Sequence, residues 1–169
     1  MAESETRHGV ELSHLDSLLF ECAEATKRDL VDYLAAVADR LLAELRDRPL
    51  SVIRARPGQK PFMQKNVPTY APSWIRTVRI WAEASKREVA YALCNDVRTL
   101  LWFANQRAIE YHPTLGRGDL WHPTHLILDL DPPEDGGFGL AVATAHLVRQ
   151  ALDDTDLAGA VKTSGAKGL

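Results

Sequence analysis

The stretch HLILDLDPP, residues 125–133, decides how we interpret this sequence. Its apolar run, residues 126–128, is typical of a strand that is buried on both faces. Asp129 and Asp131 follow, and the prolines at 132–133 end the expected strand. Because residues i and i+2 of a strand point to the same side, both carboxylates should leave the strand end side by side.

Two neighbouring carboxylates repel each other unless a proton or a cation lies between them. A hard divalent cation that keeps some of its waters and also binds phosphate oxygens is the usual partner of such a pair. Asp129 and Asp131 are therefore candidate catalytic and metal-binding residues. The alternative from these residues alone is a pair of aspartates in a solvated turn, because turns favour polar residues.

A second candidate site lies one predicted helix later, in the segment KTSGAKGL. Gly165 and Gly168 allow backbone N–H groups to approach an anion, and Ser164 and Lys167 add a hydroxyl donor and a positive charge. These groups suit a phosphate, although their spacing is not that of a Walker A loop. Taken alone, this segment could be an ordinary loop. Because it follows the paired aspartates by one predicted helix, the two motifs together predict a site for a metal ion and a triphosphate.

The rest of the chain predicts alternating strands and helices. Residues 1–11 are polar and should be loose. We expect one helix from Thr26 to about Leu45, further helices over 96–107 and 138–152, and strands over 50–56, 61–68, 77–82, 88–93, 109–112 and 160–162. Strands on both sides of the last helix would form a β–α–β-like unit that places the aspartates and the Gly-rich turn at neighbouring strand ends.

Composition bounds the class of protein. The 169 residues, with 46% apolar and 25% charged side chains, suit one globular domain or part of one. A net charge of −3 gives no overall basic character, so contact with nucleic acid would need a local patch. Cys22 and Cys94 lack metal-ligand spacing, and no signal peptide or membrane span is evident; we expect free thiols and a cytoplasmic location.

The motifs LDLDPP and KTSGAKGL, in this order, resemble those of the polymerase domain of bacterial ligase D and its stand-alone relatives in the archaeo-eukaryotic primase superfamily. Three upstream blocks extend the resemblance over nearly the whole chain: ATKRDLVDYLAAVADRLLAELRDRPL, PFMQKNVPTYAPSWIRTV and NDVRTLLWFANQRAIEYHP. Together with the order of elements, the resemblance implies an α+β fold of the primase-polymerase type, α/β-like in part, with mixed, largely antiparallel sheets and flanking helices.

The resemblance implies template-directed nucleotidyl transfer to DNA 3′ ends, in gap filling or end extension during DNA break or excision repair. It also implies ribonucleotides among the substrates and Mn²⁺ or Mg²⁺ as cofactor. The expected partners are primer–template DNA with gapped or broken ends, nucleoside triphosphates, a ligase and end-binding repair proteins.

The resemblance assigns roles to single residues around the incoming nucleotide. Asp129 and Asp131 match the catalytic motif that holds the metal ions. The nucleotide-binding residues that it implies are Ser164, Gly165, Lys167 and Gly168, with His112 near the incoming nucleotide; from the sequence alone, His112 is equally well a satisfied structural histidine.

Further matches concern DNA. Phe62 matches one of two adjacent aromatic residues that contact the template strand, where base stacking is the physical reason. Met63 replaces the second, and Lys65 is a candidate phosphate contact. Lys27 matches a lysine that binds the 5′-phosphate of the downstream strand, but another family lysine is replaced by Ser17, which puts tight phosphate recognition in doubt.

The largest departure is at the end of the chain. The family's motif continues from KGL to a histidine, and a third metal-binding aspartate follows later; the sequence contains neither. We therefore expect residues 12–169 to be the N-terminal portion of such a domain, incomplete at the C-terminus, with little or no polymerase activity alone. Apolar residues of the interrupted sheet should then face solvent or a partner chain.

Two other functions remain open at this point. A catalytically dead DNA-binding or scaffolding remnant would use a basic patch, and its binding would weaken steeply with salt. The residues of that patch would be Arg54, Arg56, Lys60 and Lys65. A haloacid-dehalogenase-type phosphatase also places two aspartates after a strand, but its motif continues with Thr or Val where this chain has Pro133.

Overall fold

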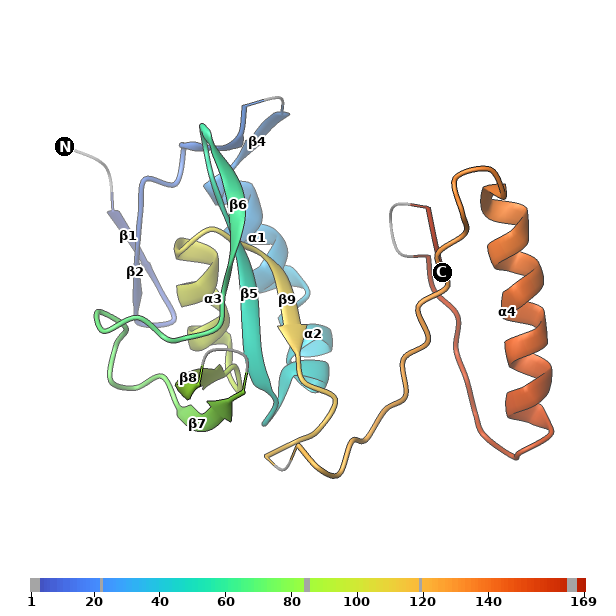
Figure 1. Ribbon diagram of the computed structural model, residues 1–169. Coiled ribbons are helices and arrows are strands. Elements are labelled where there is room, and N and C mark those ends of the chain that lie inside the picture. The colour runs from blue at the N-terminus through green and yellow to red at the C-terminus, as the bar shows by residue number, and fades with distance from the viewer. Residues whose placement is uncertain (1–3, 22, 84–85, 119, 164–166) are drawn as a thin grey trace. The chain divides into compact units, whose positions relative to one another are not determined.

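The computed structural model describes residues 4–21, 23–83, 86–118, 120–163 and 167–169. The protein divides into two compact units, Met1–His125 and Leu126–Leu169 (Figure 1). None of the helices in the described part of the chain combines the length and the hydropathy that a bilayer span requires.

A five-stranded sheet forms the centre of the first unit (Figure 1). Its strands are β5 (Pro49–Arg56), β6 (Gln59–Gln64), β7 (Thr77–Ala82), β8 (Arg87–Leu93) and β9 (Ala108–Pro113). β5 pairs with β9 along one edge and with β6 and β8 along the other, and every pairing is antiparallel. The predicted hairpin of β7 and β8 is confirmed, as is the mixed α+β fold with antiparallel sheets.

The N-terminal segment differs from the expectation that residues 1–11 are loose. β1 (Ser4–Arg7) and β2 (Val10–Ser13) form a hairpin, and β3 (Leu18–Phe20) pairs with β4 (Ala23–Thr26). His8 and Gly9 both have positive φ angles, 49° and 73°, as a two-residue type I′ turn requires. Val10 and Leu12 alternate toward the core, so this polar-looking segment buries one apolar face.

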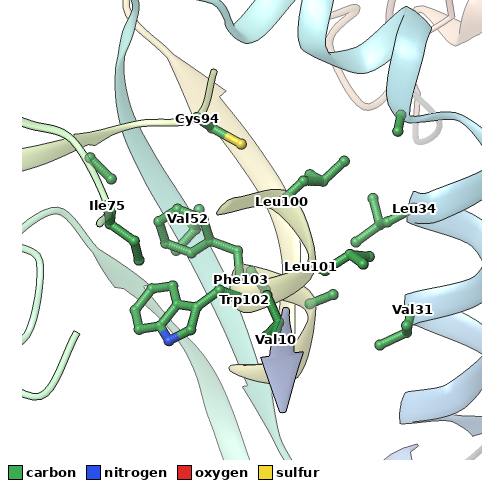
Figure 2. Packing of buried hydrophobic residues seen from close by; sticks show 14 of the residues in the cluster. Val10, Val31, Leu34, Val52, Ile75, Cys94, Leu100, Leu101, Trp102 and Phe103 are labelled. Atoms are coloured by element: carbon green, nitrogen blue, oxygen red, sulfur yellow. The ribbon is translucent and has the colours of Figure 1, made fainter. Parts of the chain in front are cut away.

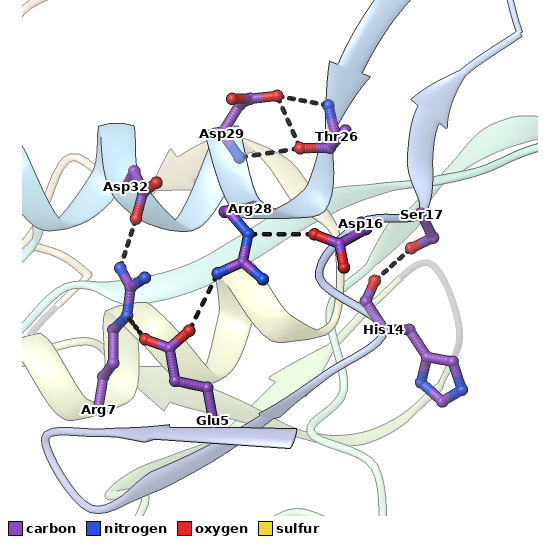
Figure 3. A network of polar contacts seen from close by, with 9 residues as sticks. All are labelled: Glu5, Arg7, His14, Asp16, Ser17, Thr26, Arg28, Asp29 and Asp32. Carbon is purple, nitrogen blue, oxygen red and sulfur yellow. Dashed lines mark hydrogen bonds and ion pairs between the residues drawn. The ribbon is translucent and has the colours of Figure 1, made fainter. Parts of the chain in front are cut away.

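A network of charged side chains links the first hairpin to the helix that follows (Figure 3). Arg7 forms ion pairs with Glu5 and Asp32. Arg28 binds Glu5 at 3.0 Å and Asp16 at 3.1 Å. The hydrogen bonds from Arg7 and Arg28 lower the pKa of the Glu5 carboxyl, and both arginines of this exposed cluster are already paired with carboxylates.

The predicted helix from Thr26 to Leu45 is in fact two helices, α1 (Lys27–Ala36) and α2 (Ala38–Leu45). They are separated at Val37, whose φ and ψ of −99° and 6° are not helical. Val37 is β-branched, which lowers its helix propensity. Thr26 caps α1 as predicted, in a reciprocal capping box with Asp29, and Asp96 caps α3 (Val97–Asn105).

The hydrophobic core lies between α1, α3, β2 and β5 (Figure 2). Leu100 and Leu101 of α3 and Val31 of α1 are fully buried in it. Phe103 lies edge-on to Trp102, with the ring centres 5.0 Å apart. Burial of each such side chain contributes about 1.5–3 kcal/mol, so this core fixes the helices against the sheet.

In the second unit the predicted helix is confirmed as α4 (Gly137–Asp153). The predicted stripe of Ala141, Ala145, Val148 and Leu152 lies on its less exposed side. The two predicted strands, over residues 126–131 and 160–162, are absent, which corrects the expectation of a β–α–β-like unit.

The missing strand at residues 126–131 has a physical reason. A buried strand needs neighbours at both edges and on both faces, and the described residues of this unit offer little of either. Leu126 and Ile127 are therefore 72% and 68% exposed. The expectation was that apolar residues of the interrupted sheet face solvent or a partner chain, and in this unit Leu126 and Ile127 face solvent.

Candidate functional site

Asp129 and Asp131 line the same hollow of the second unit, which has a volume of about 200 Å³. The prolines that follow them and residues Leu140, Ala141 and Thr144 of α4 complete its wall. Both aspartates are exposed. The pair therefore presents carboxylate oxygens to one water-accessible space, although the segment that carries them is not a strand.

Gly168 lies directly against this acidic segment. A Cβ atom at Gly168 would be 2.8 Å from Oδ1 of Asp131 and 2.7 Å from the carbonyl oxygen of Leu130. Leu130 and Leu169 exchange two backbone hydrogen bonds, with N–O distances of 3.1 and 3.3 Å. The end of KTSGAKGL thus runs beside the aspartates, and only a residue without a side chain fits at position 168.

The other residues of the Gly-rich segment are less completely described. Lys167 is exposed. Ser164 and Gly165 lie outside the described residues, so their predicted roles stay predictions. The structure therefore brings together three of the predicted site residues, Asp129, Asp131 and Gly168.

The donor set at the hollow fits a small hard cation. Mg²⁺ and Mn²⁺ prefer oxygen ligands, and Mg²⁺ is commonly held by one or two carboxylates, waters and substrate phosphates. Two carboxylates beside an open hollow meet that description. No cluster of three or more His, Cys, Asp or Glu side chains suited to a metal occurs in the described ranges, so waters and substrate would have to supply the other ligands.

Phe62 lies on β6 of the first unit and is 37% exposed. The guanidinium groups of Arg56 and Arg54 lie 5.2 and 5.6 Å from its ring centre, within cation–π range. Met63 beside it is 49% exposed, and Lys65 is exposed. The predicted DNA-contact residues of β6 and the following loop therefore lie on the surface.

Arg54 corrects the expected composition of the basic patch. It is only 8% exposed, and its guanidinium donates to the backbone oxygen of Gln106 at 2.7 Å and to Oε1 of Gln64 at 2.7 Å. Arg54 therefore supports Phe62 from within the fold and is not an open surface charge. Arg56, Lys60 and Lys65 are exposed, as the patch requires.

His112 lies on β9 with its side chain 45% exposed. Its Nε2 atom is 2.9 Å from Oε2 of Glu110, two residues earlier on the same side of the strand. The imidazole thus has one partner within the protein and remains accessible from outside.

Lys27, the first residue of α1, is only 4% exposed, and its Nζ donates to the carbonyl oxygen of Ser13. Burial and, second, the charge of Arg107 lower the pKa of the Lys27 ammonium to about 8. Sequence reasoning did not single out Arg107. It lies between α3 and β9, where it reads as an ordinary helix-ending residue, and nothing in its spacing links it to Lys27.

Comparison with known proteins identifies the family. The profile of the LigD primase-polymerase domain matches residues 26–169. The non-homologous end joining protein LigD of Bacillus subtilis is 34% identical over 162 residues, which are 95% of this chain and 26% of that protein. LigD of Mycolicibacterium smegmatis is 30% identical over 165 residues, covering 95% of this chain and 21% of that protein.

A solved structure supports the same relationship. The polymerase domain of Mycobacterium tuberculosis ligase D, in complex with DNA, matches with a TM-score of 0.83 and 30% identity. The match covers 94% of this chain and 58% of that one, and the chain spans about a quarter of the length of the curated relatives. The chain therefore belongs to the family of LigD primase-polymerase domains.

Proposed function

We propose that the chain acts in template-directed nucleotidyl transfer to DNA 3′ ends during the repair of broken or gapped DNA. One observation carries the proposal: Asp129 and Asp131 share a hollow, and Gly168 approaches Asp131 so closely that a Cβ atom on the glycine would lie 2.8 Å from Oδ1 of Asp131. Carboxylates that could bind a metal ion thus lie next to backbone that could bind a phosphate, within the second unit.

The residues around the hollow have distinct tasks in this proposal. Asp129 and Asp131 hold Mn²⁺ or Mg²⁺, which when bound neutralises phosphate charge and activates the attacking hydroxyl. Gly168 keeps the space beside Asp131 open, and the exposed ammonium of Lys167 attracts the triphosphate. Ser164, Gly165 and His112 take their nucleotide-binding roles from the family resemblance alone.

The first unit supplies the DNA contacts in this proposal. Phe62 offers an exposed aromatic face for a template base, and base–aromatic stacking contributes about 1–3 kcal/mol per base. Arg56 adds a cation at the ring, and Lys65 is positioned on the surface for a backbone phosphate. The solved relative that contains DNA supports DNA as a partner.

Binding of Mn²⁺ and a nucleoside triphosphate to this chain tests the proposal. Asp129→Ala should weaken Mn²⁺-dependent triphosphate binding at least about tenfold, because it removes a charge-assisted metal contact. Asp154→Asn, at the exposed C-terminal end of α4, is the matched control and should change little. Equal effects of both substitutions, or none, would contradict the assignment.

Mn²⁺-dependent triphosphate binding, rather than primer extension, separates the polymerase from the alternative DNA-binding remnant. With only two acidic ligands, we expect little extension by this chain itself, yet Mn²⁺-dependent triphosphate binding should persist. A chain that binds DNA but never binds a triphosphate would favour the remnant.

A further inference from the structure

β7 is the last strand at one end of the five-stranded sheet (Figure 1). It pairs with β8, from Thr77 opposite Ala92 to Ala82 opposite Arg87, without a shift in register. Within the described ranges no other segment pairs with β7. One edge of this strand therefore carries a row of backbone groups that no neighbouring strand uses.

The hydrogen bonds around β8 show which residues of β7 face the open edge. The N–H of Leu93 donates to the carbonyl oxygen of Arg76 at 2.9 Å, so the even-numbered residues of β7 exchange hydrogen bonds with β8. Ala90, opposite Arg79, instead accepts from the N–H of Val67 at 2.8 Å, on the side away from β7. The residues whose N–H and C=O groups point outward are therefore Thr77, Arg79 and Trp81.

The other outer strands of the sheet carry features that discourage further pairing. β6 contains Pro61, β9 ends at Pro113, and the pairing of each with β5 contains a register shift. Proline removes a backbone donor and a bulge bends the strand, so both hinder the addition of another strand. β7 has neither feature, and Arg79 is its single charged residue.

The charges along the open edge favour an acidic partner. Arg79 is exposed, and its Nη1 lies 3.6 Å from Oε2 of Glu88. Arg76, just before the strand, is also exposed and lies 4.0 Å from Asp47. Both separations exceed hydrogen-bond distance, and such exposed ion pairs contribute little to stability. Both guanidinium groups are therefore available to carboxylates of another chain.

Two other occupants fit this edge less well. A second copy, in the antiparallel register that pairs all three outward residues, would place Arg79 opposite its own counterpart, and like charges directly opposite are destabilising. The phosphates of a nucleic acid could meet the arginines, but they only accept hydrogen bonds. They would leave the outward carbonyl oxygens of β7 without a donor from the partner.

We propose that β7 is the docking edge for an extended acidic segment of another protein, which adds to the sheet as one more strand. Backbone hydrogen bonds to the outward residues provide affinity, and carboxylates opposite Arg76 and Arg79 provide specificity. Trp81 is exposed, and its Nε1 donates to Glu83 at 3.1 Å, so the ring is oriented to cover an apolar side chain of that segment. This inference is independent of the paired aspartates in the second unit.

Binding of synthetic peptides to the full chain tests the inference. The probe is a fluorescein-labelled peptide in which Glu alternates with Val, and fluorescence anisotropy measures its Kd. N-methyl groups on the Glu residues remove the donors that face β7, whereas N-methyl groups on the Val residues remove donors that face away. We expect the first modification to weaken binding at least about tenfold, as replacement of Glu by Lys should, and the second to change it little.

Matched variants locate the peptide on β7. Arg79→Glu turns attraction into repulsion and should weaken binding about tenfold. Arg40→Glu changes the net charge equally at an exposed position of α2 and should have little effect. Thr77→Pro removes an outward N–H at the first residue of an outer strand, where proline is tolerated, and should weaken binding relative to Thr77→Ala. Thermal melts confirm that each variant is folded.

Hydrogen exchange gives a readout that follows the alternation of β7. In the free protein, the outward amides of Thr77, Arg79 and Trp81 should exchange fast, and those of Val78 and Ile80 slowly. The acidic peptide should slow the outward amides and leave the other two unchanged. Outward amides that stay fast with saturating peptide would overturn the inference.

The remaining outcomes are equally distinct. Absence of peptide binding, equal binding of the two N-methylated peptides, or equal effects of Arg79→Glu and Arg40→Glu would each overturn the inference. Slow outward amides in a dimer that forms without peptide would identify a second copy as the occupant instead. Binding of single-stranded DNA that depends on Arg79, without binding of the peptide, would make the edge a nucleic-acid contact. All of these results leave the proposed metal and triphosphate site untouched.

Discussion

Gly168→Ala is the sharpest single test of the hollow around the paired aspartates. The new methyl carbon would lie 2.7 Å from the Leu130 carbonyl oxygen and 2.8 Å from Oδ1 of Asp131. Ordinary contact begins at 3.4 Å, so these atoms must separate by 0.7 Å (3.4 − 2.7) and 0.6 Å (3.4 − 2.8). One of the two is backbone and cannot rotate away.

The energy of this clash can be bounded. Added methyl groups in well-packed sites cost about 1–3 kcal/mol. If the strain is relieved by moving Asp131 and the strand-like pairing of Leu130 with Leu169, Mn²⁺ affinity should fall between about 5-fold and about 150-fold. The backbone amide of Leu130, which donates to Leu169 at 3.1 Å, should exchange its hydrogen faster.

Two measurements decide the outcome: Mn²⁺ titration followed by electron paramagnetic resonance, and hydrogen exchange of the Leu130 amide. Gly139→Ala is the matched control, because nothing lies within 4 Å of a Cβ atom there and the residue is helical. It should leave Mn²⁺ affinity unchanged and stabilise α4 by up to about 1 kcal/mol. Unchanged Mn²⁺ affinity and exchange in Gly168→Ala would refute the close approach of Gly168 to the acidic segment.

Three further predictions concern the first unit. Leu101→Ala, at a fully buried position of α3, should lower the free energy of unfolding by about 2–5 kcal/mol in urea titration; a loss below about 1 kcal/mol would contradict the core packing. Thr26→Ala removes the capping box of α1 and should cost about 1 kcal/mol, whereas Thr26→Ser should be nearly neutral in the same titration. Burial lowers the pKa of Lys27 to about 8 in the folded protein, from the ordinary value of 10.5. The unfolded chain therefore binds more protons above pH 8, and the free energy of unfolding should rise from pH 8 to 9. Lys27→Met should flatten this slope, and an identical slope in both proteins would argue against the lowered pKa.

The pH dependence of stability that comes from Lys27 is best measured below about pH 9. Burial raises the pKa of the Cys94 thiol from 9.0 to about 12. Above pH 9 the unfolded thiol loses its proton first, so this group lowers stability as the pH rises. The difference between wild type and Lys27→Met isolates the lysine, because Cys94 is present in both.

Local signals in the sequence predicted much of the first unit. Asp96 caps α3 as expected, and the apolar pattern that includes Leu100 and Leu101 marks the buried side of that helix. These features depend on residues within one or two turns of each other. The break at Val37 escaped prediction because the apolar period continues across it.

Features that depend on distant partners were not predictable in the same way. The apolar run at 126–128 has the composition of a buried strand, but composition cannot say whether neighbouring strands are there to cover it. Arg107 donates to Oγ of Ser17 although the two residues are 90 apart in sequence, and no period connects them. The proximity of Gly168 to Asp131 was anticipated, whereas the roles of Ser164 and Gly165, which lie outside the described residues, still rest on the resemblance.

The buried guanidinium of Arg48 shapes how the first unit ends. It donates to the carbonyl oxygens of Thr114 and Leu115 at 3.1 and 2.6 Å, and it reaches Oγ1 of Thr124 at 2.7 Å and Nδ1 of His125 at 2.9 Å. The Arg48 side chain thus binds both ends of the loop between Leu115 and Thr124. A longer or shorter loop should therefore cost little entropy, while the point at which the chain leaves the unit stays anchored.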